Sequence, residues 1–202
     1  SRRLIGMEKE LFVAPSFFPV LRHRFPKISR VEVRLQRGRA RNELVKFRYH
    51  AILHLGNPDA QPQSWDEVNA ENMTVDEIRH WLTAKRPNRV WLTGLRNARL
   101  SSEARLGGLL SSADAEGRVI DLRRRLGEPH QEGVDPEDVR HLAAEHFYRA
   151  ELSWSESGSE GCFDAALVRQ DVADQAPIST PLEARTDPGR SGSSGTNNPL
   201  QS

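Results

Sequence analysis

Two kinds of hydrophobic repeat alternate along the first part of the chain. A helical repeat predicts a helix over Ala14–Arg24, with Pro15 in the first turn, where its missing N–H costs nothing. A period of two over Val31–Leu35, and again over Val45–Leu55, predicts two strands. The polar connection Gln36–Glu43 joins them, so the pattern indicates an antiparallel hairpin with a long basic tip.

The remaining elements follow from capping residues and from the same two periods. Residues 56–73 have the composition of a loop, and Thr74 with Glu77 then forms a capping box that begins a helix ended by Pro87. Asp135, followed by Pro136, is a strong N-cap. The full set of further predictions is helices over 3–10, 102–110, 119–126 and 135–146, and strands over 89–93, 148–154 and 162–168.

The chain changes character near residue 170, where apolar residues become rare. Residues 170–202 are rich in Pro, Ser, Gly, Thr and Asp, and such a segment buries too little surface to offset its ordering entropy. We therefore predict a disordered tail that acts as a flexible linker. The fold class is α/β, or α+β for the chain taken as a fragment, with predicted units 1–56, 57–169 and 170–202.

Composition excludes several classes of protein. Hydrophobic residues make up 37% of the 202, and no run approaches the ~18 apolar residues that a membrane span needs. The start lacks the apolar core of a secretory signal, and the single Cys162 excludes a disulfide framework. We expect a cytoplasmic protein. Because residue 1 is Ser and not Met, we also expect a piece of something longer.

The net charge of +1 conceals an uneven distribution. Residues 1–56 carry 13 Lys and Arg against 4 Asp and Glu, whereas residues 57–202 carry 16 against 24. The division indicates a basic interaction surface or two charge-complementary halves. The basic residues around the hairpin tip are Arg34, Arg37, Arg39, Arg41, Lys46 and Arg48. This cluster fits a solvated tip, the docking of an acidic partner or nucleic-acid binding, but it lacks the aromatic residues on which single-stranded bases stack.

Metal and nucleophile chemistry has little support in the sequence. His50 and His54 are four apart on a predicted strand, and His141 and His146 are five apart on a predicted helix, so neither pair has ligand spacing. Cys162 lies in an apolar strand without a base partner and is interpreted as a buried structural thiol. We predict no metal, and no phosphate-binding, dinucleotide-binding or serine-hydrolase motif is present.

One segment carries a more specific signal. Residues 42–52 read NELVKFRYHAI, which resembles the second core motif, NELSxYRYxAV, of methyltransferase domains embedded in nonribosomal peptide synthetases. The departures are Val45 for Ser, Phe47 for Tyr and Ile52 for Val. Residues 150–164 resemble the third motif through Glu151, Ser153 and Asp164, and residues 196–200 resemble the junction to an adenylation domain's small C-terminal part.

The resemblance implies roles for residues of the second motif. Asn42 is expected to orient the acceptor amine or a carboxylate, and Glu43 to lie near the developing ammonium. Tyr49 is expected to hydrogen-bond the amine or line the methyl pocket. Phe47 and Arg48 are expected to contact substrate. The alternative is structural: Phe47 and Tyr49 as core-facing strand residues and Arg48 as an outward one, with Glu151 and Asp164 also structural.

The resemblance further implies what the whole enzyme does. It points to N-methylation, with S-adenosylmethionine as donor, of an aminoacyl thioester carried on the phosphopantetheine arm of a carrier protein, next to an adenylation domain. The family's glycine-rich first motif, which holds the donor, does not occur in these residues. We therefore expect the C-terminal antiparallel hairpin of a class I methyltransferase-like fold without its parallel strands, followed by an appended helix–strand–hairpin unit, and inactive alone. The alternatives are a non-catalytic docking module and a nucleic-acid-binding domain.

Overall fold

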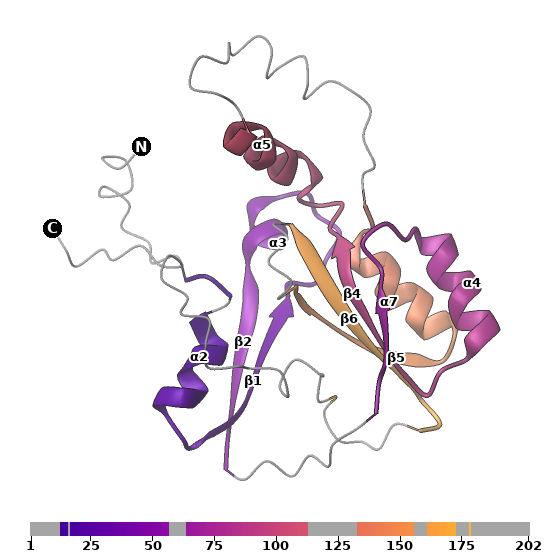
Figure 1. The fold of residues 1–202 in the computed structure, drawn as a ribbon, viewed down its shortest axis with the longest axis horizontal. Coiled ribbons are helices and arrows are strands. Elements are labelled where there is room, and N and C mark those ends of the chain that lie inside the picture. Colours follow the sequence, from indigo (N-terminus) through magenta and orange to yellow (C-terminus); the bar gives the residue numbers. More distant parts are fainter. Residues whose placement is uncertain are drawn as a thin grey trace, which may run out of the picture.

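The fold is built around one mixed sheet of six strands (Figure 1). The structure is a computed structural model, and it describes residues 13–15, 17–56, 64–112, 133–155, 161–172 and 178. The strands are β1 (Ile28–Leu35), β2 (Tyr49–Leu55), β3 (Asp66–Asn69), β4 (Arg89–Arg96), β5 (Tyr148–Trp154) and β6 (Cys162–Arg169). The helices are α2 (Phe17–Arg24), α3 (Glu43–Phe47), α4 (Val75–Lys85), α5 (Ser101–Ser112) and α7 (Pro136–Glu145).

The strand order is β2-β1-β5-β6-β4-β3. Neighbouring strands are antiparallel except β3 and β4, which run parallel. The parallel pair corrects two sequence predictions. The sequence predicted no parallel strands and assigned residues 56–73 to a loop, because β3 has only four residues and carries three polar ones. The mixed α/β class is confirmed.

The β1–β2 hairpin is confirmed, with Leu35 opposite Tyr49 and Val31 opposite Leu53. Its second strand is shorter than predicted. Val45 and Phe47 continue the period of two in the sequence, but they lie on the short helix α3, which is begun by the Asn42 cap. A side-chain hydrogen bond at the cap favours helical turns locally over extension of the strand.

The hairpin joins the rest of the sheet at one end of β1, where Arg34 pairs with Ser153 of β5. Leu35 is the β1 residue that enters the main core. The sheet thus crosses the predicted boundary at residue 56, and the 74–168 region covers part of the hairpin. The division of the chain into units 1–56 and 57–169 stays a prediction.

The main core lies between the sheet and helices α4 and α7 (Figure 1). Ile78 and Leu82 of α4 and Val139 and Leu142 of α7 are buried against inward-facing residues of β4, β5 and β6. Both helices begin where the sequence predicted: Thr74 and Glu77 form the capping box, and Asp135 accepts a hydrogen bond from the amide of Glu137. Helix α5 and strands β5 and β6 are also confirmed.

Strand β4 continues three residues beyond the predicted Thr93, through Gly94, which has φ +73°. Its register against β6 shifts between Leu92 and Leu95, and the Gly94 amide donates to the buried Asp164 carboxylate at 2.8 Å. A left-handed residue at a bulge favours glycine. Asp164, the last residue of the third-motif resemblance, therefore has a structural contact.

Two predicted helices, over 3–10 and 119–126, lie outside the described residues. Most of the predicted tail, 170–202, does so as well. Within it Ile178 is described and is buried against Trp91, Ala166 and Val168.

Candidate functional site

The second-motif residues lie at the tip of the hairpin, where α3 approaches α5 at one end of the sheet (Figure 1). Lys46 of α3 binds Glu103 of α5 at 2.6 Å, and this contact lowers the pKa of the Glu103 carboxyl. Asn42 is the N-cap: its Oδ1 accepts a hydrogen bond from the Val45 amide at 3.0 Å. The Asn42 Nδ2 has no hydrogen-bond partner among the described residues, so it can donate to a ligand.

Three further motif residues are exposed on this tip. Glu43, Phe47 and Arg48 are all open to solvent, and neither Glu43 nor Arg48 forms an ion pair within the described part of the chain. Glu43 and Phe47 are four residues apart on α3 and so share one face of it. Phe47 is 50% exposed, so the core-facing alternative for this residue is wrong: it lies on a helix and not on the predicted strand.

Tyr49, the first residue of β2, turns away from that surface. Its ring meets Phe18 of α2 edge to face, with ring centroids 5.8 Å apart, and its hydroxyl donates to the carbonyl of Val13. Partial burial raises the pKa of the Tyr49 hydroxyl. The structure therefore places Asn42, Glu43, Phe47 and Arg48 on one exposed tip, and it places Tyr49 in the contact between the hairpin and α2.

A buried arginine that the sequence analysis did not single out fixes the position of this tip. The Arg99 side chain is only 4% exposed. Its Nη1 donates to the Gln36 carbonyl at 3.0 Å, and its Nη2 donates to the Gly38 carbonyl at 2.7 Å and to Asp135 Oδ1 at 3.1 Å. Arg99 lies in the turn after β4, where no periodicity marks a residue as buried, so the local sequence holds no signal for it.

The basic cluster around the tip is partly neutralised within the chain. Arg39 binds Asp138 at 2.7 Å, which raises the pKa of its guanidinium, and Arg37 approaches Glu137 at 3.7 Å. Arg34 pairs with Glu151 at 3.3 Å. The acidic first turn of α7 thus faces the basic tip, as expected for charge-complementary halves. Among the described residues, Arg41 and Arg48 have no ion pair, so only part of the cluster is left for a nucleic acid or an acidic partner.

The histidines of the hairpin contact polar side chains of the same hairpin. His50 contacts the Gln36 side chain at 2.7 Å, and His54 contacts Glu32 at 2.9 Å. Within the described ranges, no group of three or more His, Cys, Asp or Glu residues is placed to hold a metal ion. Cys162 is buried, as predicted, and burial raises the pKa of its thiol.

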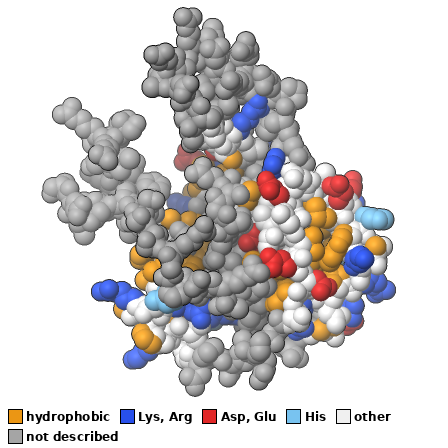
Figure 2. Space-filling view, viewed as in Figure 1, with side chains coloured by type: hydrophobic (Ala, Val, Ile, Leu, Met, Phe, Trp, Pro, Cys, Tyr) orange, Lys and Arg blue, Asp and Glu red, His pale blue; other side chains and the backbone are white. Residues whose placement is uncertain are grey.

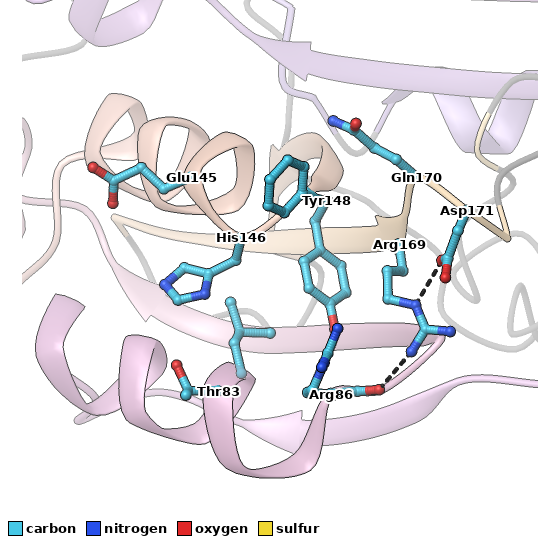
Figure 3. A pocket seen from close by; sticks show the side chains of 10 residues that line it. Thr83, Arg86, Glu145, His146, Tyr148, Arg169, Gln170 and Asp171 are labelled. Atoms are coloured by element: carbon cyan, nitrogen blue, oxygen red, sulfur yellow. Dashed lines mark hydrogen bonds and ion pairs between the residues drawn. The ribbon is translucent and has the colours of Figure 1, made fainter.

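A separate hollow of about 550 Å³ lies where α4, α7 and β6 end (Figure 3). None of the motif residues lines it. Its polar groups are used to hold these ends together: Tyr148 donates to the Pro87 carbonyl at 2.7 Å, and Arg169 binds Asp171 at 2.6 Å and the Arg86 carbonyl at 3.1 Å. We assign no ligand to it.

The described residues do not supply a cradle for S-adenosylmethionine. A doubly wound sheet holds such a nucleotide-like ligand at a glycine-rich turn after a parallel strand. The parallel pair here is β3 and β4, and the turn after β4 (Asn97–Leu100) contains no glycine. In addition, no described helix is long and apolar enough to span a membrane.

Comparison with known proteins identifies large synthetases as relatives of this chain. The chain is 34% identical over 183 residues to chondramide synthase cmdD of Chondromyces crocatus, covering 87% of this chain and 5% of that protein. It is 31% identical over 172 residues to a probable non-canonical nonribosomal peptide synthetase, CymA, of Salinispora arenicola, covering 83% of this chain and 2% of that protein. Cyclosporin synthetase simA of Tolypocladium inflatum is 29% identical over 177 residues, covering 80% of this chain and 1% of that protein.

These relatives are far longer than the chain, which spans about one twentieth of the first and less of the others. No protein-family model matches it. The similarity covers most of the described residues, including the hairpin tip and the α7–β5–β6 unit. The chain is therefore a relative of a short segment of nonribosomal peptide synthetases, the family whose embedded methyltransferase domains its motifs resemble.

Proposed function

We propose that this chain is the C-terminal portion of an S-adenosylmethionine-dependent methyltransferase domain of a nonribosomal peptide synthetase. The carrying observation is the motif at Asn42–Ile52, found in a chain whose relatives are such synthetases. In the intact enzyme the acceptor would be the amine of an aminoacyl or peptidyl thioester on a carrier protein, with an adenylation domain as neighbour. The cytoplasmic location predicted from the sequence is part of this proposal.

The geometry of the tip supports a part in binding the acceptor. In the intact enzyme, S-adenosylmethionine bound by other parts of the synthetase would supply the methyl group for transfer to the acceptor amine. Catalysis depends mainly on orientation and on placing charge where it develops. The tip offers an amide donor on a fixed cap at Asn42, a carboxylate at Glu43 and an exposed aromatic ring at Phe47. Lys46 of the same helix binds Glu103, and Arg99 holds the preceding loop at Gln36 and Gly38.

The donor would be bound by other parts of the synthetase, because the described residues lack the cradle for it. We therefore expect the isolated 202-residue chain neither to bind S-adenosylmethionine tightly nor to turn over. Calorimetric detection of micromolar binding by the 202-residue chain would overturn that part of the proposal.

The test uses the synthetase protein that contains this segment, with its carrier loaded with an amino acid and methyl-labelled S-adenosylmethionine as probe. We expect label on the carrier-bound amino acid, located on nitrogen by mass spectrometry after release. If no label is transferred by a synthetase that still loads its carrier, the proposal is refuted.

Asn42 offers a matched pair of variants. Asn42→Asp keeps an equally good cap but replaces the amide donor with a carboxylate, whereas Asn42→Ala removes both. If Asn42 contacts the acceptor, Asn42→Asp lowers methyl transfer by roughly two- to tenfold, which is the net contribution of one hydrogen bond, with an unchanged melting temperature. Full activity in Asn42→Asp would restrict this residue to capping.

A further inference from the structure

Helices α4 and α7 both end at residues whose backbone conformation favours glycine. Arg86, the C-cap of α4, has φ +43°, and Phe147, which follows the C-cap of α7, has φ +62°. Within the described residues these are the two non-glycine residues with positive φ. A Cβ makes the left-handed conformation costly, and helices that end in it usually carry glycine there. A larger side chain at such a position therefore needs a compensating contact.

The Phe147 side chain has little such compensation within the described part of the chain. It is 71% exposed and belongs to neither of the two hydrophobic clusters. Its carbonyl accepts a hydrogen bond from the Gln170 amide at 2.8 Å, but a glycine would supply that carbonyl equally well. The ring therefore lowers stability twice, through exposure of apolar surface to water and through backbone strain. Residues strained in this way cluster at functional sites.

Both residues line the hollow of about 550 Å³ at the ends of α4, α7 and β6 (Figure 3). The two acids that line it are already paired: Asp171 binds Arg169 at 2.6 Å, and Glu145 approaches Arg79 at 3.7 Å. The exposed guanidinium of Arg86, in contrast, forms no ion pair with any described residue. The charge that is left uncompensated at the hollow is therefore positive.

The rim of the hollow thus combines an aromatic ring with a free guanidinium, and both residue types are enriched in protein–protein interfaces. Lys85, next to Arg86, is also exposed and lacks an ion pair within the described ranges. Figure 2 shows Lys and Arg side chains at the surface around the end of α4, beside hydrophobic and acidic ones. The polar groups inside the hollow serve the fold, so the rim fits a protein segment that carries an apolar side chain next to a carboxylate.

We propose that Phe147 and Arg86 dock an acidic segment of the synthetase polypeptide outside these 202 residues. An apolar side chain of that segment packs on the Phe147 ring, and a carboxylate binds the Arg86 guanidinium. This chain spans 5% or less of each related synthetase, so polypeptide to supply the segment is present in all of them. The inference depends on the relationship to synthetases and not on methyl transfer, so the labelling assay above and the experiment below fail independently.

The experiment is site-specific photo-crosslinking in the purified synthetase that contains this segment. The photoreactive amino acid p-benzoylphenylalanine replaces Phe147, and the crosslinked peptides are identified by mass spectrometry after irradiation and digestion. We expect one dominant crosslink, to a peptide outside residues 1–202 that is rich in Asp and Glu. The same amino acid in place of Leu106, a 39% exposed leucine on α5, is the control and should not give that crosslink.

Two variants separate docking from folding. Arg86→Glu should lower the yield of the crosslink from position 147 at least about tenfold, because attraction of a carboxylate becomes repulsion. Arg41→Glu is the matched control and should leave the yield unchanged, since Arg41 is also exposed and has no ion pair among the described residues but lies at the hairpin tip. Phe147→Gly should raise the melting temperature of the 202-residue chain by roughly 2–4 °C, because it relieves the strain.

Three results would overturn the inference. One is the absence of a dominant crosslink from position 147, or a crosslink confined to residues 1–202 or to a peptide without acidic residues. Another is a crosslink yield that Arg86→Glu does not lower more than Arg41→Glu does. The third is a lower melting temperature in Phe147→Gly, because the ring would then support the fold of this chain.

Discussion

The burial of Arg99 allows a quantitative prediction about the hairpin tip. Its guanidinium makes three hydrogen bonds, to the carbonyls of Gln36 and Gly38 and to Asp135, and the side chain is almost inaccessible to water. Arg99→Met keeps much of the volume but leaves these acceptors without their donor. At roughly 1 kcal/mol net for each bond, the substitution should cost about 3 kcal/mol, near the lower end of the roughly 3–5 kcal/mol for breaking a buried ionic network.

Urea unfolding of the full chain measures this directly. A loss of about 3 kcal/mol lowers the midpoint by about 1–3 M at an m-value typical of small proteins. It lowers the melting temperature by about 6–12 °C for a chain of this size. Arg99→Lys should fall between wild type and Arg99→Met, because one ammonium cannot reach two carbonyls and a carboxylate with the fork geometry of arginine.

Arg96→Ala is the matched control. Arg96 pairs with Glu71 at 3.2 Å, and both side chains are close to half exposed, so this substitution should cost less than about 1 kcal/mol. A loss below about 1 kcal/mol for Arg99→Met, or one no larger than that for Arg96→Ala, would refute the view that Arg99 anchors the tip.

Three other substitutions and one chemical modification test local features. Gly133 has φ +77°, and a Cβ there would lie 2.8 Å from the Arg96 carbonyl carbon. Gly133→Ala should therefore destabilise the chain by at least about 2 kcal/mol in a thermal melt. Gly108 lies in open space on α5, so Gly108→Ala should stabilise the chain by about 0.5–1 kcal/mol in the same melt. Thr74→Ala should lower the free energy of unfolding by about 1 kcal/mol, because it removes the capping side chain of α4. Hydrogen bonds from the Thr74 amide and hydroxyl lower the pKa of Glu77, so their stabilisation is present above the unfolded-state pKa and is lost as the pH falls through the folded-state pKa. The melting temperature of the variant, which lacks the hydroxyl, should therefore fall less on acidification than that of the wild type. Iodoacetamide should modify Cys162 at least roughly 100-fold more slowly in the native chain than in urea, since burial raises the pKa of the thiol and reaction needs local opening; equal rates would show that β6 is open.

The uneven distribution of charge along the chain can be seen in the composition, but the ion pairs that result from it cannot. An excess of Lys and Arg before residue 57 and of Asp and Glu after it is evident in the sequence, and so is the alternative of complementary halves. The partners are not evident. Arg39 binds Asp138 across 99 residues of chain, and Arg99 brings the hairpin tip and the α7 cap together.

The sequence by itself determined the elements whose signals are local. Capping at Thr74 and Asp135 depends on side chains within three residues of the helix start, so both helices begin where predicted. Strand β5 has an alternating sequence and strand β6 is a mostly apolar run that is buried on both faces, and both lie where predicted. The motif at Asn42–Ile52 is equally local, and it identified the synthetase relationship that the comparisons support.

Tertiary structure decided what depends on distant partners. The start of β2 was mispredicted because the Asn42 cap competes with strand extension, and β3 was missed because four mostly polar residues become a strand only beside β4. The joining of the hairpin to β5 and the burial of Arg99 arise from contacts between residues far apart in sequence. Local periodicity does not depend on such contacts, so the sequence pattern alone could not predict where the candidate site lies in the fold.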